Sequence, residues 1–142
     1  MPVTPEHVGF LIADVSRMMR LEFQRRIEHS AITLAQSRAL VYVSRHEGVR
    51  QVDLAQLLEV QPITLARLID QLEGDGLVER RADPGDRRAY QIYLTPKAEQ
   101  KLAIIEEVGA SVREDAMSGL SAEERSLLHA ILSRMRGNLS GR

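Results

Sequence analysis

Arginine is the residue type that gives this chain most of its capacity for polar recognition. The 142 residues include 17 arginines but only two lysines, Lys97 and Lys101. The guanidinium group is a planar fork that binds phosphate, carboxylate and the edge of guanine through paired hydrogen bonds. A genome rich in G and C would produce the same bias, so the position of each arginine decides its meaning. The positions of interest are Arg67 and the pair Arg87-Arg88.

Residues 51–68 have the pattern of a helix-turn-helix with a polar outer face. Small Ala55 lets two helices approach closely, and apolar side chains fill their shared core: Leu54, Leu58, Val60, Leu65 and Leu68. The outward-facing candidates for DNA contact are Gln61, Pro62, Thr64 and Arg67 on the second helix, with Gln51 at the start of the first. Exposed polar side chains at a helix N-terminus are what entry into the major groove requires. A helical hairpin with no role in nucleic-acid binding fits the same stretch.

A β-hairpin is predicted directly after this helix pair. Residues 77–81 form one short strand, and Tyr90, Ile92 and Leu94 alternate with polar or partly polar neighbours in the other. Asp83-Pro84-Gly85-Asp86 has the composition of a turn. A hairpin in this position makes a winged helix, whose tip carries Asp86, Arg87 and Arg88. An extended Arg is attracted to a narrow minor groove, and Asp86 is expected to hold an Arg side chain in that pose. On its own, such a turn is usually a solvated loop.

Amphipathic helices are predicted on both sides of the winged helix. An apolar stripe runs from Val8 to Ile27, and Thr33 or Ser30 is expected to cap the next helix. Thr95-Pro96 is expected to cap and begin a long helix, and residues 121–124 fit a capping box that opens the last helix. Apolar residues also lie off the main stripes, at Phe10, Leu21, Ile104 and Leu120. They predict contact with a second copy of the chain, although packing within one subunit is an alternative.

The predicted fold is therefore α+β and mainly α, a winged helix-turn-helix flanked by N- and C-terminal dimerisation helices. Residues 1–142 form a single domain. Residues 6–30 and 96–140 supply the dimerisation helices, and residues 33–95 form the DNA-binding winged-helix lobe. The second helix of the lobe's helix pair has its apolar pattern at Ile63, Leu65, Leu68, Ile69 and Leu72.

The chain resembles the MarR family of transcriptional regulators, and within it the SlyA-like branch. The resemblance rests on the segments 61–78, 83–89 and 92–98, and the order of helices matches over nearly the whole chain. It implies a homodimer of triangular shape that presents two winged-helix lobes to a pseudo-palindromic operator in double-stranded DNA, most commonly as a repressor. It also implies that Arg67 reads a base from the recognition helix and that Arg88 is the wing arginine, oriented by Asp86.

The resemblance further implies a small ligand, often an aromatic acid or a conjugate of one, between the dimerisation helices and the lobe. The corresponding residues here are Met19, Arg20, Phe23, Arg38 and Tyr42. An Arg beside apolar and aromatic side chains suits a carboxylate on a hydrophobic body. Met19 and Phe23 also lie on a core stripe, so ordinary packing is an alternative.

Two features of the lobe depart from the usual pattern. Glu59 lies at the turn where helix-turn-helix proteins often have Gly, and since a positive φ is uncommon for other residues, a different turn is an alternative. Residues 33–95 also carry 8 Arg and 9 acidic residues, a net charge of −1. DNA binding would therefore depend on where individual arginines lie, and it would be sensitive to salt.

Several classes of function are excluded or disfavoured. The chain has no cysteine, so disulfides, thiolate metal sites and thiol redox switches are excluded. Its four histidines lack metal-ligand spacing, and no phosphate loop or nucleophile motif is present, so neither catalysis, a cofactor nor a metal is expected. No membrane-spanning run or signal peptide is recognised, which predicts a cytoplasmic protein without a membrane partner. The rival function is a winged helix that binds protein and has no sequence-specific contact with DNA.

Overall fold

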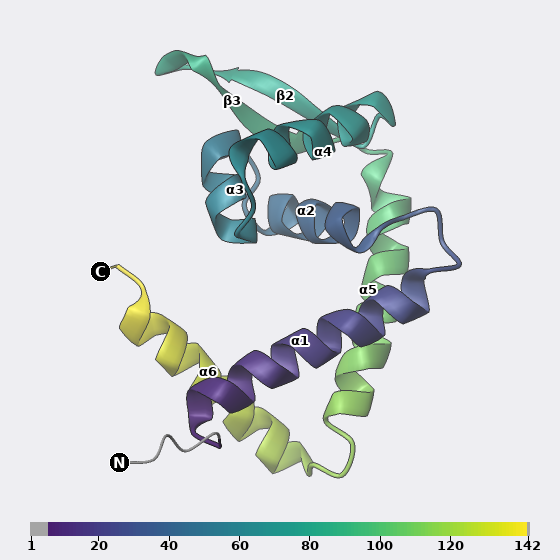
Figure 1. Cartoon of the computed structure of the whole chain (residues 1–142), viewed down its shortest axis with the longest axis vertical. Coiled ribbons are helices and arrows are strands. Elements are labelled where there is room, and N and C mark those ends of the chain that lie inside the picture. The colour runs from purple at the N-terminus through teal and green to yellow at the C-terminus, as the bar shows by residue number, and fades with distance from the viewer. Residues whose placement is uncertain (1–5, 142) are drawn as a thin grey trace.

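The computed structural model describes residues 6–141 and contains six helices and a three-stranded sheet within that range (Figure 1). The helices are α1 (Val8–Ile27), α2 (Leu34–Arg45), α3 (Gln51–Leu58), α4 (Pro62–Gly74), α5 (Ala98–Ala116) and α6 (Ala122–Leu139). The strands are β1 (Val49–Arg50), β2 (Val78–Asp83) and β3 (Asp86–Leu94). This is the mainly helical winged helix that the sequence predicts, with α3, α4 and the β2–β3 hairpin in the expected order.

The starts of the helices follow local capping chemistry. Thr33, not Ser30, caps α2 in a reciprocal capping box with Gln36, and Ser121 does the same for α6 with Glu124. The predicted start of α5 at Thr95-Pro96 is wrong, because residues 96–97 form a turn and the helix begins at Ala98. The N-cap is Lys97, two residues after Thr95, and the Thr95 hydroxyl donates a hydrogen bond to the carbonyl of Gly76.

The sheet is antiparallel, with the strand order β1-β3-β2. Pro84-Gly85 connects β2 to β3 as predicted, with a register irregularity at Ala82/Asp83. The two-residue β1 was not expected, because a strand of that length has no periodicity of its own and exists only through its pairing with Ile92 and Gln91 of β3. The three strands join the wing to the helix pair, since β1 leads directly into α3.

The winged-helix lobe (residues 33–95) has its core between α2, α3, α4 and the sheet. Fully buried side chains from each of these elements meet there, namely Leu40, Val43, Leu54, Leu65, Ile69, Leu72 and Ile92. One expected member of this pattern, Ile63, is not buried, because the first turn of α4 lies beyond the core and leaves the side chain 61% exposed. Leu65, two residues later, is the first residue of α4 to reach the core.

The helices outside the lobe are poorly buried. α1 crosses α5, and α6 turns back beneath the N-terminal half of α1 (Figure 1). α1 buries only Ile27, and α6 buries no residue. Large apolar side chains are exposed along both helices: Val8, Phe10, Leu11, Ile12, Val15, Met18 and Leu21 on α1, and Leu127, Leu128, Ile131, Leu132 and Leu139 on α6. Of the off-stripe residues, Phe10, Leu21 and Ile104 are exposed and Leu120 is half-buried.

The turn between α3 and α4 keeps its shape despite having Glu59 where Gly is common. Glu59 itself takes the left-handed conformation, with φ 56° and ψ 43°, and is the one non-glycine residue with positive φ between residues 6 and 141. Its backbone N–H donates to the carbonyl of Gln56, and the N–H of Val60 donates to that of Ala55. The alternative of a different turn is therefore wrong, and the chain accepts the steric cost at this residue.

None of the helices within residues 6–141 has both the length and the apolar character that crossing a bilayer would need.

Candidate nucleic-acid interface and ligand pocket

The first two turns of α4 present an open polar face. Gln61 is the N-cap, Pro62 is the first helical residue, and Thr64 and Arg67 are exposed. Pro suits this position because its missing N–H would have no helical partner. The Arg67 side chain makes neither a hydrogen bond nor an ion pair with any residue from 6 to 141. Its guanidinium group is therefore available to an external partner.

The N-termini of α3 and α4 both lack a side-chain cap. Neither Arg50 nor Gln61 accepts a hydrogen bond from the first turn of the helix that it precedes. α5 also begins without a side-chain cap, whereas α1, α2 and α6 are each capped by a side chain. Uncapped N–H groups at a helix start favour a nearby anion, because the helix dipole is positive there.

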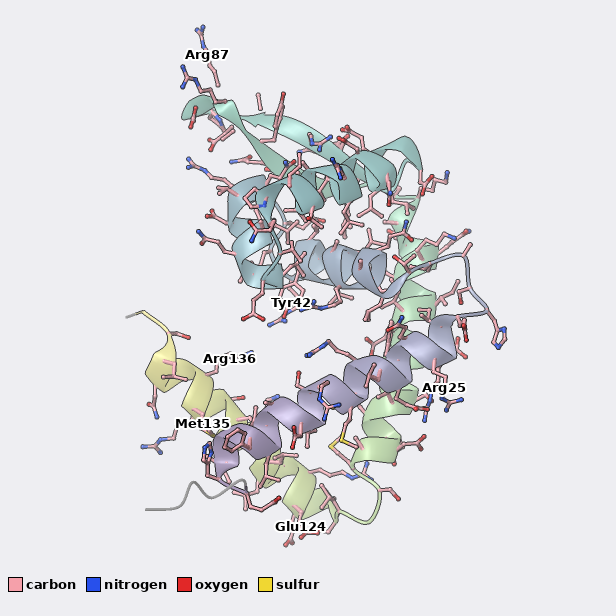
Figure 2. The ribbon with its side chains drawn as sticks, in the orientation of Figure 1. Arg25, Tyr42, Arg87, Glu124, Met135 and Arg136 are labelled. Atoms are coloured by element: carbon pink, nitrogen blue, oxygen red, sulfur yellow. The ribbon has the colours of Figure 1, made fainter. Side chains whose placement is uncertain are left out.

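The wing extends from the lobe and carries cations at its tip. Arg87 points away from the body of the molecule (Figure 2), and Arg88 is also exposed. Within residues 6–141 neither guanidinium group has an ion-pair partner. Among the described residues no Arg side chain donates to Asp86, and its carboxylate accepts the backbone N–H of Arg88 at 2.9 Å. An Asp at a turn readily accepts from the N–H two residues ahead, so Asp86 orders the wing backbone.

The helix pair and the wing enclose a shallow cavity of about 290 Å³. Four of the predicted DNA-contacting residues line it together, namely Gln51, Pro62, Asp86 and Arg88, alongside Arg50, Val52, Ala89 and Tyr90. Thr64, Arg67, Gln61 and Arg87 lie outside its lining. Gln51 differs from the others because its side-chain oxygen accepts a hydrogen bond from Nε of Arg80 at 2.9 Å. Its polar group is thus already engaged within the chain.

Arg80 on β2 joins three elements of the lobe, and sequence reasoning missed it. Besides Gln51 at the start of α3, its guanidinium group contacts α4 at the Ala66 carbonyl (3.1 Å), at Asp70 (2.7 Å) and at Glu73 (3.1 Å). The side chain is only 15% exposed. This set of contacts, which we call the Arg80 clamp, fixes α4 against the base of the wing. An Arg on a strand gives no sequence signal for such a role, because its partners lie 7 to 29 residues away.

Pairing within the lobe explains how a net charge of −1 still leaves a cationic face. Three arginines of the lobe form ion pairs with acidic side chains. Arg50 pairs with Asp83, Arg80 pairs with Asp70 and Glu73, and Arg81 pairs with Glu79. Asp83 is buried at the end of β2, beside the Pro84-Gly85 turn, where Nε of Arg50 lies 2.5 Å from one carboxylate oxygen and the N–H of Gly85 donates to the other. The arginines without an acidic partner include Arg67, Arg87 and Arg88, which lie on α4 and the wing tip.

A second cavity of about 290 Å³ lies between α1, α2 and α5. The structure brings all five predicted ligand residues to it: Met19, Arg20, Phe23, Arg38 and Tyr42. The rest of its lining includes apolar residues of α2 and α5, namely Leu34, Val41, Ile105 and Val112. This cavity lies where the lobe meets the flanking helices, as the resemblance to the family implies.

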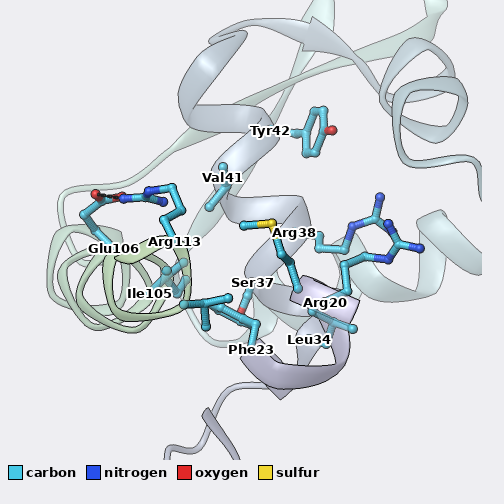
Figure 3. A pocket seen from close by; sticks show the side chains of 13 residues that line it. Arg20, Phe23, Leu34, Ser37, Arg38, Val41, Tyr42, Ile105, Glu106 and Arg113 are labelled. Carbon is cyan, nitrogen blue, oxygen red and sulfur yellow. Dashed lines mark hydrogen bonds and ion pairs between the residues drawn. The ribbon is translucent and has the colours of Figure 1, made fainter. Parts of the chain in front are cut away.

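The two ends of this pocket differ in electrostatics. Arg20 and Arg38 extend to the same side in Figure 3, where Arg20 donates to the Ser16 hydroxyl at 2.7 Å and Arg38 has no hydrogen-bonding or ionic partner within residues 6–141. At the opposite side Arg113 donates to Glu106 at 2.7 Å, which forms a neutral ion pair. The pocket therefore offers unneutralised positive charge at one end only.

Sequence reasoning missed the contribution of α5 to this pocket, including Glu106, Gly109 and Arg113. Gly109 was a usable signal, because Gly inside a helix is disfavoured unless another group must approach. A Cβ added there would lie 3.2 Å from Nη1 of Arg113, so Gly makes room for that guanidinium group.

Metal chemistry finds no support in the part of the chain that the structure describes, since no three His, Asp or Glu side chains gather there with metal-binding geometry.

Comparison with known proteins places this architecture among transcriptional regulators. The model of the MarR family matches residues 32–90, which is almost the whole winged-helix lobe. A solved structure of MarR has a TM-score of 0.82 and 26% identity, with 97% of this chain and 95% of that chain covered. The transcriptional regulator PA3341 shares 42% identity over 96% of this chain and 100% of its own, with a TM-score of 0.79. The transcriptional regulator SlyA shares 31% identity, with 92% of each chain covered and a TM-score of 0.72.

A more distant relative has a known small-molecule effector. BpsR of Bordetella bronchiseptica, whose DNA binding is regulated by 6-hydroxynicotinic acid, has 24% identity and a TM-score of 0.73, covering 96% of this chain and 98% of that chain. At this identity the likeness concerns the fold.

Proposed function

The chain belongs to the MarR family of transcriptional regulators, and we propose that it is a repressor that binds a pseudo-palindromic operator in double-stranded DNA as a homodimer. Proteins of this family are non-enzymatic and bind DNA as dimers. The identity with SlyA over most of the chain supports a place in the SlyA-like branch. A repressor of this kind works in the cytoplasm, where bacterial DNA is found.

The observation that carries the DNA-binding proposal is the set of unpaired arginines on one functional unit. Arg67 on α4 and Arg87 and Arg88 on the wing have no acidic partner within residues 6–141, although the lobe as a whole is not basic. We assign base reading in the major groove to Arg67, and contact with the minor groove to Arg88. Gln61, Pro62, Thr64 and the uncapped helix starts then face the DNA backbone and neighbouring bases.

The homodimer proposal rests on the exposed apolar faces of α1 and α6. Val15 of α1 is 50% exposed, and Leu127 and Ile131 of α6 are 59% and 47% exposed. Two helices of 20 and 18 residues with apolar faces open to water are expected to bury them against the same helices of a second copy. The two recognition helices would then lie about 34–36 Å apart, one turn of DNA, or a multiple of it.

A mobility-shift assay on the DNA upstream of the protein's own gene tests the proposal. Arg67→Ala is expected to weaken binding to the best site by about 1–3 kcal/mol and to relax the preference at one base position. Arg45→Ala is the control, because this exposed arginine of α2 stacks on Tyr42, away from α4 and the wing, and should leave binding unchanged. Failure of the parent protein to prefer any DNA sequence would favour the winged helix as a protein-binding module. A stable monomer in light scattering at micromolar concentration would refute the dimer.

We also propose that the pocket between α1, α2 and α5 binds a small aromatic carboxylate, or a conjugate of one, that modulates DNA binding. The carboxylate is assigned to Arg20 and Arg38, and the ring to Met19, Phe23 and Tyr42. BpsR, which shares the fold, has its DNA binding regulated by an aromatic carboxylic acid, 6-hydroxynicotinic acid. An effector shifts the DNA-competent population only as far as it binds one state better than the other, so a modest preference causes partial release.

Titration of aromatic acids and their thioester conjugates against a labelled operator tests this assignment. Arg38→Ala is expected to weaken the response more than Arg113→Ala, because Arg113 is already neutralised by Glu106. The assignment fails if no compound changes DNA affinity at saturation, or if Arg20→Ala and Arg38→Ala both respond like the parent protein.

A further inference from the structure

Ile63 has an unusual position for a large apolar side chain. It is the second residue of α4, and at 61% exposure it is the most exposed large hydrophobic residue of the winged-helix lobe. Nearby Leu65 and Ile69 are both fully buried. Ile63 therefore contributes nothing to the core that its sequence pattern suggested.

Ile63 and Arg67 share one face of α4. Residues four apart lie one turn from each other on the same side of a helix, and this side is opposite to the buried Leu65. Both side chains are exposed, and Arg67 has no partner within residues 6–141. An apolar side chain and a free guanidinium group are thus presented together to whatever α4 binds.

We propose that Ile63 reads thymine in the operator by packing against its 5-methyl group in the major groove. The inference rests on the proposed DNA-binding function and adds a second base-reading residue to it. Apolar side chains recognise thymine through that methyl, as Arg recognises guanine through O6 and N7. One helical turn is about 5.4 Å, and bases on a strand are about 3.4 Å apart, so the two side chains read positions one or two steps apart.

The surroundings of Ile63 favour DNA over a protein partner. Large continuous apolar patches are typical of protein-docking surfaces. Around Ile63 the exposed residues Gln61, Thr64 and Arg67 interrupt any such patch with polar groups. A single apolar side chain among hydrogen-bonding groups matches the mixed surface of a thymine-containing major groove.

Replacement of thymine by uracil, which lacks only the 5-methyl group, tests the proposal. The full-length protein first selects its best duplex from a randomised duplex library, and each thymine of one half-site is then replaced singly by uracil. For the parent protein, Kd is expected to rise about three- to tenfold at one thymine, as for the loss of one buried methyl contact. Ile63→Ala should bind the thymine and uracil duplexes within about twofold of each other, because the shortened side chain no longer reaches the methyl from this position.

Two further variants keep the result specific. Ile63→Val retains a branched side chain and should keep most of the sensitivity to uracil. Leu57→Ala removes another exposed apolar side chain, 42% accessible, from α3, where it lines none of the cavities described, and should keep all of it. Thermal unfolding of each variant confirms that the fold is intact, which is expected because neither side chain is buried.

The outcomes separate the inference from the function on which it rests. If the parent selects a specific duplex but no thymine is sensitive to uracil, or if Ile63→Ala is as sensitive as the parent, the role of Ile63 is overturned and DNA binding stands. If the parent selects no specific duplex, the proposed function fails and the inference fails with it.

Discussion

Removal of the Arg80 side chain should loosen the packing of α4 against β2 and the start of α3. Arg80→Ala deletes the hydrogen bonds to Gln51 and to the Ala66 carbonyl, and the ion pairs to Asp70 and Glu73. The first two contacts are expected to contribute about 0.5–1.5 kcal/mol each. The acidic partners are 66% and 42% exposed, so their pairs add at most about 1 kcal/mol each. The free energy of unfolding should therefore fall by about 1–5 kcal/mol.

Arg81 provides a matched control on the same strand. It pairs with Glu79 and lies 3.8 Å from the centre of the Tyr93 ring, but its side chain is 56% exposed and it contacts neither α3 nor α4. Arg81→Ala should cost about 1 kcal/mol or less. Arg80→Lys separates charge from geometry, because an ammonium group keeps the charge and lacks the planar fork that reaches several partners. It should recover less than half of the lost stability.

Urea denaturation followed by circular dichroism, at a fixed protein concentration, measures these differences. The concentration must be fixed because association contributes to the apparent stability of a dimer. A fall of less than about 0.5 kcal/mol for Arg80→Ala, below one ordinary hydrogen bond, would refute the clamp. Equal losses for Arg80→Ala and Arg81→Ala would refute it as well.

Three other perturbations have defined outcomes. Asp86→Ala should weaken DNA binding although it removes a negative charge, because the backbone N–H of Arg88 loses its acceptor. Asp86→Asn should keep the turn, since an amide oxygen also accepts this bond. Tighter binding by both variants in a mobility-shift assay would contradict this role. Hydrogen bonds from Arg25 and Arg26 lower the pKa of Glu22 from 4.5 to about 2. The contribution of the ionised Glu22 carboxylate to the stability of the fold is therefore complete above pH 4.5 and is lost as the pH falls from about 4.5 to about 2. The stability difference between the parent and Glu22→Gln should shrink over that range, and a constant difference in pH-dependent melting would refute it. Glu59→Gly removes the strain of the left-handed conformation but makes the unfolded chain more flexible. The free energy of unfolding should therefore be unchanged or rise by up to about 1 kcal/mol. A fall of more than about 1 kcal/mol in urea denaturation would argue against strain at this turn.

The fold was predictable where the signal is local. Capping residues, the helical period and a Pro-Gly turn act over a few residues, so α2, α6 and the β2–β3 hairpin were found from the sequence. The strand β1 and the start of α5 depend on partners far along the chain. Val49 is a strand residue only because Ile92 lies beside it. Thr95 lies before the start of α5, and its hydroxyl donates a hydrogen bond to the Gly76 carbonyl.

The candidate sites show the same division. The five predicted pocket residues line one cavity. They could be chosen from the sequence because resemblance to a family carries information about tertiary structure that periodicity lacks. The Arg80 clamp was missed because nothing in the sequence distinguishes a clamping Arg from a solvated one. The bond from the backbone N–H of Arg88 to Asp86 was not anticipated, since a carboxylate beside two arginines also has the backbone as a partner. Ile63 fitted the apolar period but lies one turn before the core begins.

The position of the pocket has a consequence for how the protein would sense a ligand. Because its lining comes from α1, α2 and α5, any occupant links the lobe to the flanking helices and adds its binding free energy to that junction. Thermodynamic linkage makes the effect reciprocal. If an effector lowers the affinity for operator by some factor, then operator lowers the affinity for effector by the same factor. Protein bound to operator would therefore need an effector concentration higher, by that same factor, than the concentration that half-saturates free protein.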